Sequence, residues 1–349
     1  MKKIALLTDY RGQFYSSIQK STAGMDLDKI KNKFSEYGMY IEIIPFQDVD
    51  FSQDWSEYYV LYQSSEDRGL LYKGYISDVL TMLEKLGATL IPNFEAFYCH
   101  ENKVYQSLLG NNIELEGVKI PKSSVYGTLE CLENDIENIH FPIVLKSAEG
   151  CQSKGVALIK SQKELRSTAK KLMSTFNFKD VLRYKLKSFF KDGYIMESSH
   201  RSKVILQEFV PDLPGDYKVL VYKNKTYALK RLNRKNDFRA SGSGRFEFST
   251  DVPDEVLQAA NNLVEHFKCP YISVDLAFDP RGKEVHLIEF QFLMFGTYTL
   301  EKSPHYFVKE DANWKVIEQN SVLEHELVDS IVDYISKYHG EVGKYHGED

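Results

Sequence analysis

Residues 146–156 read KSAEGCQSKGV, and they say more about the architecture of the chain than any other stretch. The apolar run before Lys146 predicts one strand, and the apolar run from Val156 predicts a second. Between them lies a polar tip bounded by Gly150 and Gly155, and glycine lets backbone N–H groups approach phosphate oxygens closely. The pattern is not a Walker A loop, because GxxxxGK[ST] is absent and a strand follows instead of a helix. Alone, the stretch predicts a hairpin whose tip is either a phosphate site or an ordinary polar turn.

A second stretch, residues 206–219, reads LQEFVPDLPGDYKV. A predicted strand runs into a turn rich in proline and glycine, and Asp216 and Lys218 begin the next strand. Such a linker can offer backbone groups to an adenine edge and a carboxylate to a ribose. By itself it is an unremarkable connection between two strands.

A third element combines cations with small residues. Lys230 and Arg231 precede residues 236–245, which read NDFRASGSGR. Cations beside a flexible loop suit an anion, although a charged surface loop has the same composition.

The fourth element is a pair of strands predicted at 271–278 and 285–290, joined by the turn DPRG. Side chains alternate along a strand, so Glu289 and Gln291 share one face. If the strands pair, Asp275 can converge with them and bring three oxygen-bearing side chains together. Magnesium prefers a few carboxylate or amide oxygens plus nucleotide phosphates. A lone Asp on a strand is usually structural, but three such groups between apolar residues predict a metal site.

Taken in this order, the four elements resemble the ATP-grasp superfamily, and within it the RimK-like amine ligases, which join an amino group to a carboxylate. The family's glycine loop, Gln-Glu-aromatic linker, Asp-Phe-Arg loop and Val-Asp strand all have counterparts, and Gln291 stands where the family usually has Asn. The matching residues are Lys146, Glu149, Gly150, Gln152, Gly155, Val156, Gln207, Glu208, Phe209, Asp216, Asp237, Phe238, Arg239, Val274, Asp275, Glu289 and Gln291.

The resemblance implies an α/β (α+β) fold of the ATP-grasp type. An N-terminal parallel α/β domain at 1–100 would be followed by two α+β lobes, at 101–205 and 206–338, that clasp ATP. Residues 339–349 would form a mobile tail.

The resemblance also implies a mechanism and its cofactors, ATP and Mg²⁺ or Mn²⁺. A substrate carboxylate, on a small molecule or a peptide, would attack the γ-phosphate of ATP, and an amine would capture the acyl phosphate. Lys146 and Lys218 would hold phosphates, Arg239 would steady the transferring group, and Lys218 and Arg239 are the catalytic candidates. Asp275, Glu289 and Gln291 would hold the metal. The residues expected around the nucleotide are Lys103, Lys146, Glu149, Gly150, Gln152, Gly155, Gln207, Glu208, Phe209, Val210, Asp216, Lys218 and Lys230.

Two other functions stay open on the same residues. One is phosphoryl transfer to an acceptor that is not a carboxylate. The other is a module that binds ATP without turnover, although the presence of all three candidate metal ligands argues against it. The products distinguish the three functions. A ligase gives ADP and an amide, a phosphotransferase gives ADP and a phosphorylated product, and a module without turnover gives no ADP.

The N-terminal region and the composition complete the expectations. Short apolar runs alternate with a helical pattern at 75–86, which predicts a mostly parallel sheet, and one further helix is expected at about 95–109. The absence of GxGxxG makes a classical dinucleotide site improbable. A net charge of −6 argues against a nucleic-acid binder, and no apolar run suggests a membrane span. Four scattered cysteines and no signal peptide favour the cytoplasm, and a homodimer is expected by analogy with the superfamily.

Residues 160–203 form a basic segment with twelve Lys or Arg and four acids, a net charge of +8. The rest of the chain therefore carries −14. Such segregation can produce a local positive field, so the segment is expected either to recruit an anionic acceptor or partner, or to be a solvated helical face.

Overall fold

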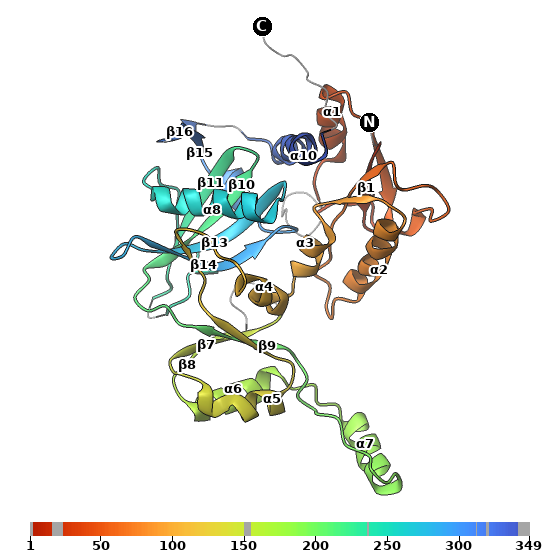
Figure 1. The fold of residues 1–349 in the computed structure, drawn as a ribbon, viewed down its shortest axis with the longest axis vertical. Helices are drawn as coiled ribbons and strands as arrows, with labels where there is room; N and C mark the ends of the chain where they lie inside the picture. Colours follow the sequence, from red (N-terminus) through yellow and green to blue (C-terminus); the bar gives the residue numbers. More distant parts are fainter. Residues whose placement is uncertain are drawn as a thin grey trace. The chain divides into compact units, whose positions relative to one another are not determined.

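The computed structural model describes residues 3–15, 24–149, 155–235, 237–311, 313–318 and 321–340 (Figure 1). The chain divides into two compact units. Unit 1 comprises residues 1–100, 115–119 and 214–349, and unit 2 comprises residues 101–114 and 120–213. The lobe boundary expected near 205 remains a prediction.

Unit 1 begins with a four-stranded sheet in the order β2-β1-β3-β4, and all three pairings are parallel. This confirms the parallel α/β region expected from the alternation of apolar runs and helical patterns. Its strands are β1 (Lys3–Thr8), β2 (Ile41–Pro45), β3 (Tyr58–Leu61) and β4 (Thr89–Ile91). Its helices are α1 (Leu27–Glu36), the 3₁₀ turn η1 (Phe46–Asp48), α2 (Leu71–Lys85) and α3 (Phe94–Cys99).

The second sheet of unit 1 has eight strands in the order β16-β15-β11-β10-β13-β14-β5, with β12 paired to β11. Its core is antiparallel, and β5 joins it in parallel. The strands are β5 (Val118–Lys119), β10 (Gly215–Tyr222), β11 (Lys225–Leu232), β12 (Phe246–Glu247), β13 (Tyr271–Asp279), β14 (Glu284–Gln291), β15 (His305–Glu310) and β16 (Asn313–Glu318). The helices are α8 (Asp254–Phe267), α9 (Tyr298–Lys302) and α10 (Leu323–His339).

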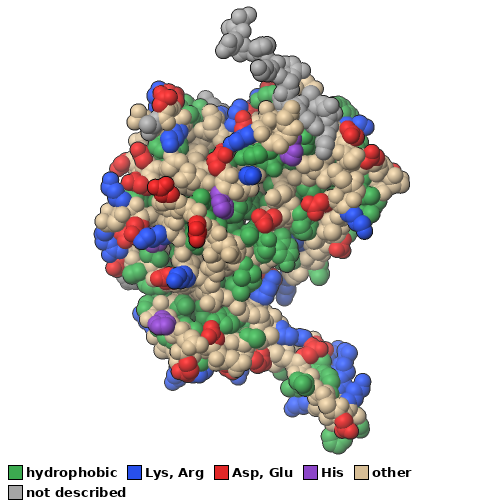
Figure 2. All heavy atoms as spheres, viewed as in Figure 1, with side chains coloured by type: hydrophobic (Ala, Val, Ile, Leu, Met, Phe, Trp, Pro, Cys, Tyr) green, Lys and Arg blue, Asp and Glu red, His purple; other side chains and the backbone are tan. Residues whose placement is uncertain are grey.

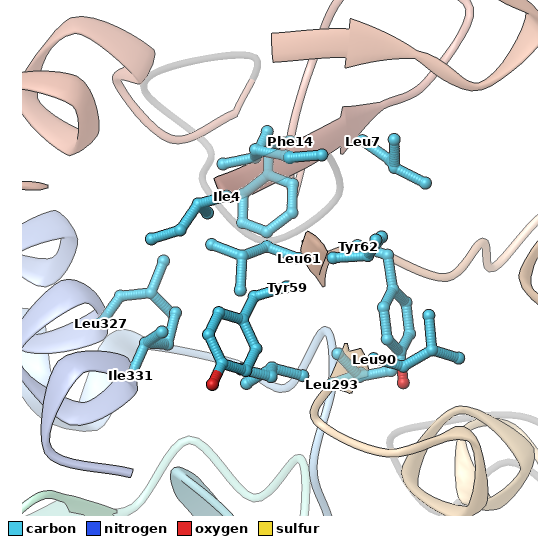
Figure 3. Close-up of a cluster of buried hydrophobic side chains, with 14 of the residues drawn as sticks. Ile4, Leu7, Phe14, Tyr59, Leu61, Tyr62, Leu90, Leu293, Leu327 and Ile331 are labelled. Carbon is cyan, nitrogen blue, oxygen red and sulfur yellow. The ribbon is translucent and has the colours of Figure 1, made fainter. Parts of the chain in front are cut away.

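One hydrophobic core joins the two ends of unit 1. Ile4 and Leu61 of the parallel sheet belong to the same buried cluster as Leu327 and Ile331 of α10 (Figure 3). Leu293, which follows β14, belongs to it as well. The parallel sheet is therefore held by side chains that lie almost at the other end of the sequence.

Unit 2 has its own four-stranded sheet in the order β6-β9-β7-β8, with antiparallel pairs throughout. The strands are β6 (Ser123–Tyr126), β7 (Ile143–Ser147), β8 (Val156–Ile159) and β9 (Val204–Glu208). The helices are α4 (Lys103–Gly110), α5 (Leu129–Asp135), the 3₁₀ turn η2 (Ile136–Asn138), α6 (Gln162–Leu172) and α7 (Phe178–Phe190). Pairing of Lys146 with Val156 confirms the hairpin predicted from the glycine-bounded stretch.

The prediction of a single helix at about 95–109 is wrong, because the structure has two helices there. α3 ends at Cys99 and α4 begins at Lys103. Between them Glu101 has a positive φ of 49°, which interrupts a helix, and the Asn102 side chain caps α4 by accepting from Tyr105 N. Asparagine is favoured at the N-cap because its side-chain oxygen accepts a hydrogen bond from an N–H group that has no partner within the helix.

The basic segment 160–203 contains two helices with different environments. α6 buries Leu165 and Ala169 in the core of unit 2, whereas α7 buries no residue. Within the described residues, no helix has both the length and the apolar character that crossing a bilayer requires.

Candidate active site

Neighbouring strands of the large sheet in unit 1 place acidic and basic side chains on one face. Asp216 on β10 lies opposite Arg231 on β11, and Lys218 lies opposite Asp275 on β13. Asp275 in turn lies opposite Glu289 on β14. Residues directly opposite one another in antiparallel strands project to the same side of a sheet. The pairing that the metal site required is therefore present, and we call these five residues the charged face.

A register shift in the β13–β14 pair follows Asp275 directly. Asp275 pairs with Glu289, while the next residue, Leu276, pairs with Leu287, which leaves Ile288 as the extra residue of a β-bulge. Bulges re-aim side chains and are frequent beside functional sites. Here the bulge lies beside the two candidate metal carboxylates.

Arg231 connects two carboxylates of the charged face. Its Nε and Nη2 atoms bind Asp216 at 2.6 and 2.8 Å, and Nη2 also lies 2.7 Å from Asp275 Oδ2. The Arg231 side chain is buried, and burial of a guanidinium is tolerable only because both acids accept from it. The sequence predicts neighbouring Lys230 at the nucleotide and Arg231 only as one of the cations that suit an anion.

The surroundings of Asp216 raise the pKa of its carboxyl group to about 6. Burial is the largest cause, and the neighbouring Asp275 carboxylate acts in the same direction, whereas Arg231 opposes both. Both Asp216 oxygens accept from Arg231, so its expected contact with a ribose remains a prediction.

Lys218 and Gln291 complete the polar groups of this face. Lys218 Nζ donates to Ser273 Oγ at 3.0 Å and lies 3.9 Å from Asp275 Oδ1. Gln291 Nε2 donates to Glu289 Oε1 at 3.2 Å. The charged face holds three carboxylates and two cations, a formal net charge of −1 that a divalent cation would reverse.

Two other predicted residues of unit 1 have different surroundings. Lys230 pairs with Tyr217 and so lies on the opposite face of the sheet from Arg231, with its Nζ 3.2 Å from Glu247. Arg239 lies in the loop after β11, where Nε binds Asp237 at 3.0 Å. These hydrogen bonds lower the pKa of Asp237.

In unit 2, the predicted nucleotide residues gather at the end of β7. Lys146 Nζ donates to Gln207 Oε1 on β9 at 2.6 Å. The backbone N–H of Lys103, at the start of α4, donates to the Ala148 carbonyl at 3.0 Å. Lys103, Lys146 and Gln207 therefore lie in one region, and exposed Glu149 follows Ala148 directly.

The linker after β9 follows a strand whose last residue, Glu208, is anchored by its backbone. Glu208 N donates to the Lys122 carbonyl at 2.9 Å, while the Glu208 side chain is exposed. Phe209 and Val210 are half-buried. Gly150 and Gln152, also predicted for the nucleotide, lie outside the described residues.

Gly155 closes the hairpin in a conformation that suits glycine. Its φ is +74°, and its carbonyl accepts from Ser147 N at 3.0 Å. A Cβ atom at this position would lie 2.3 Å from Ser147 Oγ. Any side chain here would force the Ser147 side chain to move, in addition to the strain of a positive φ.

The variant Gly155→Ala is therefore expected to unfold at clearly lower urea concentration than the wild-type chain. It combines left-handed backbone strain of about 1–2 kcal/mol with a clash. Gly193→Ala is the control, since its φ of +75° is the same and nothing lies within 4 Å of a Cβ there. Equal midpoints for the two variants would show that the Ser147 contact is unimportant.

The variant Arg231→Met is expected to lose about 3 kcal/mol of stability, because it leaves two half-buried carboxylates, Asp216 and Asp275, without their cation. Adding Mg²⁺ should restore part of the melting temperature. The exposed Arg281–Asp279 pair has a similar forked geometry, so Arg281→Met is the control and should shift melting little. If both variants melt alike, Arg231 does not stabilise the charged face.

ATP-grasp proteins combine a parallel α/β region with two α+β parts, and the comparisons with known proteins place this chain among them. A model of the RimK-like ATP-grasp domain matches residues 102–289, more than half of the chain. The chain belongs to the RimK-like ATP-grasp family. None of the curated proteins matches its sequence.

Solved structures share the fold at low sequence identity. A RimK domain ATP-grasp protein from Sphaerobacter thermophilus aligns with a TM-score of 0.51 and 11% identity over 95% of this chain and 98% of that chain. A RiPP-associated ATP-grasp ligase from Chryseobacterium gregarium, solved with ADP and a leader and core peptide, gives 0.53 and 14% over 97% of each chain. The D-alanine–D-alanine ligase from Bacillus anthracis, complexed with ATP, gives 0.52 and 15% over 98% of this chain and all of that chain.

Proposed function

We propose that this protein is an ATP-dependent carboxylate–amine ligase that acts through an acyl phosphate and releases ADP and phosphate. Membership of the RimK-like family supports ATP use and the ligase class. The observation that carries the proposal is the opposition of Asp275 and Glu289 on paired strands, with Lys218 on the same face. An enzyme of this class needs carboxylates for a metal next to a cation for phosphates.

The donor set of the charged face fits magnesium, or manganese in its place. Asp275 and Glu289 supply carboxylate oxygens, and Gln291 supplies an amide oxygen while its Nε2 binds Glu289. When bound, the metal would neutralise charge on the nucleotide phosphates. Lys218 is already held near Asp275, so the protein itself contributes a positive charge to the same face.

The other candidates would bind and orient the nucleotide. Lys146 and Lys218 would hold phosphates, and Lys103, which lies near Lys146, is proposed as a further nucleotide-binding residue. The linker at Glu208, Phe209 and Val210 would contact the base, and Arg239 would steady the transferring phosphoryl group from its loop. Fixed cations lower the barrier to phosphoryl transfer because they need no reorganisation during the reaction.

The substrates are proposed by class. The structural relatives include one ligase for D-alanine and one solved with a peptide, so a small-molecule or peptide carboxylate and a separate amine are both expected here. We also assign the enzyme to the cytoplasm, as a homodimer, with a nucleotide-binding lobe at 101–205 and a metal-binding lobe at 206–338.

The test is ADP release with carboxylate and amine pools supplied together, followed by mass spectrometry of the product. The proposal expects ADP only when both pools and Mg²⁺ are present, with an amide as product. ADP with a phosphorylated product would identify a phosphotransferase. Tight ATP binding with no ADP under any pool would identify a module without turnover.

A further inference from the structure

Helix α7 in unit 2 exposes large apolar side chains and buries none. Figure 1 shows it at the end of two extended segments, away from the sheet of unit 2. The base of this arm is closed by a β-bridge between Ser174 and His200 and by a hydrogen bond from Thr175 N to Ser199 O. We call residues 174–200 the α7 arm.

The apolar residues of α7 form a stripe. Phe178, Leu182, Leu186 and Phe190 follow one another at intervals of four, which places them along one side of a helix. Phe178, Phe189 and Phe190 are 72%, 82% and 75% exposed. The apolar surface continues past the helix, since Ile195 and Met196 are also exposed.

Basic residues border this stripe on both sides. Lys179, Arg183 and Lys187 repeat the same interval of four one position later and therefore form a neighbouring basic stripe. Lys185 flanks the apolar stripe on its other side, at 100° per residue. Asp180 is the only acid among the thirteen residues of the helix. Figure 2 shows Lys and Arg atoms along the arm and hydrophobic atoms at its end.

Among the described residues of unit 2, none covers the apolar stripe of α7. A helix of this length is marginal in water unless it packs against something, and apolar patches that remain exposed mark interaction sites. α6 carries as many lysines in the same basic segment, but it buries Leu165 and Ala169 in the core. The segment therefore holds one helix that packs in the core of unit 2, and one whose apolar side stays exposed in the part of unit 2 that the structure describes.

We propose that the α7 arm docks on an anionic membrane surface. A helix with Phe and Leu on one side and Lys and Arg on the flanks lies at the boundary between headgroups and acyl chains. The apolar stripe is convex, so it can sink into the deformable acyl-chain layer of a membrane. The cations on both of its flanks would then meet the negatively charged headgroups above that layer. A protein partner would have to supply a groove and an acidic rim on both sides of it.

The experiment is flotation of the full-length protein with vesicles of phosphatidylcholine alone or mixed with phosphatidylglycerol. Wild type is expected to float with the anionic vesicles only, and less as salt rises above about 0.1 M, where the screening length is about 10 Å. The triple variant Lys179→Glu, Arg183→Glu, Lys187→Glu should bind at least about 100-fold more weakly, as expected for three cations near such a surface. The variant Phe178→Ser, Leu182→Ser, Phe189→Ser should also lose binding.

The matched control reverses three exposed lysines of α6, with Lys163→Glu, Lys170→Glu and Lys171→Glu, and should keep vesicle binding. Because α7 buries nothing, all arm variants should melt like wild type and bind ATP equally well. The proposal is overturned if wild type stays unbound, if neutral vesicles bind it as well, or if the α6 control loses binding too. It is also overturned if the arm binds an acidic peptide and no vesicles, which would assign it to a protein partner, whatever ligase activity is found.

Discussion

Glu289→Gln is expected to fold like the wild-type chain and to lose nearly all ADP production. The change keeps the shape of the side chain but removes one of the two carboxylates that face each other across β13 and β14. Because the charged face holds three carboxylates and two cations, losing one carboxylate balances the charge, so the melting temperature should stay level or rise. Turnover against Mg²⁺ concentration, measured beside melting, is the test.

Two companion variants sharpen this test. Asp275→Asn should be as inactive as Glu289→Gln. Gln291→Asn should be tolerated, since the amide contributes no charge and asparagine is usual in the family. Wild-type turnover of Glu289→Gln at low magnesium would show that these residues are not the ligands. Loss of activity in Gln291→Asn as severe as in Glu289→Gln would show that the longer amide is specifically required.

Lys146→Ala is expected to weaken ATP binding by about 1–3 kcal/mol, the range for losing a charged hydrogen-bond donor, which corresponds to about 5–150-fold in Kd. The lysine is the penultimate residue of β7, before the loop closed by Gly155, and its Nζ atom donates to Gln207 Oε1 at 2.6 Å. Titration calorimetry with ATP and Mg²⁺ measures the effect directly.

The control for this variant is Lys160→Ala, an exposed lysine just after β8 in the same unit. It removes an equal charge and should leave ATP affinity unchanged. If the two variants bind ATP equally well, and Lys146→Ala still melts as wild type does, Lys146 does not contact the nucleotide.

The sequence was sufficient to predict the strands of the charged face and the face of Asp275. The clear DPRG turn between β13 and β14 joins two strongly apolar runs, and their alternation decides which side chains converge. The β-bulge could not be foreseen, because an extra residue in a strand leaves no compositional signal at Ile288.

The pairing of Arg231 with Asp216 was not predicted, because it depends on the register between β10 and β11. Lys223 and Asn224 form the two-residue turn, and counting outward from it pairs Asp216 with Arg231. The sequence therefore contains the information, but the register follows from it only when the position of the turn is known. Charge alone favoured neither Lys230 nor Arg231.

Composition also could not separate α6 from α7. Both are lysine-rich and amphipathic, and both have apolar residues at helical spacing. What differs is whether another element lies against the apolar side, which is a tertiary property. A single helix at about 95–109 would place Asn102 in its interior, whereas in the structure the Asn102 side chain caps α4.

The shared core of unit 1 has a consequence for how the chain matures during synthesis. Ile4 and Leu61 leave the ribosome more than two hundred residues before Leu327 and Ile331, with which they share a core. The first sheet must therefore wait, partly uncovered, through the synthesis of more than two hundred further residues, whereas unit 2 draws its core from residues 126–206 and can close long before. Contacts so distant in sequence fold slowly. We therefore expect the nascent parallel sheet to expose apolar surface until α10 is made, and a ribosome stalled before α10 to release an aggregation-prone chain.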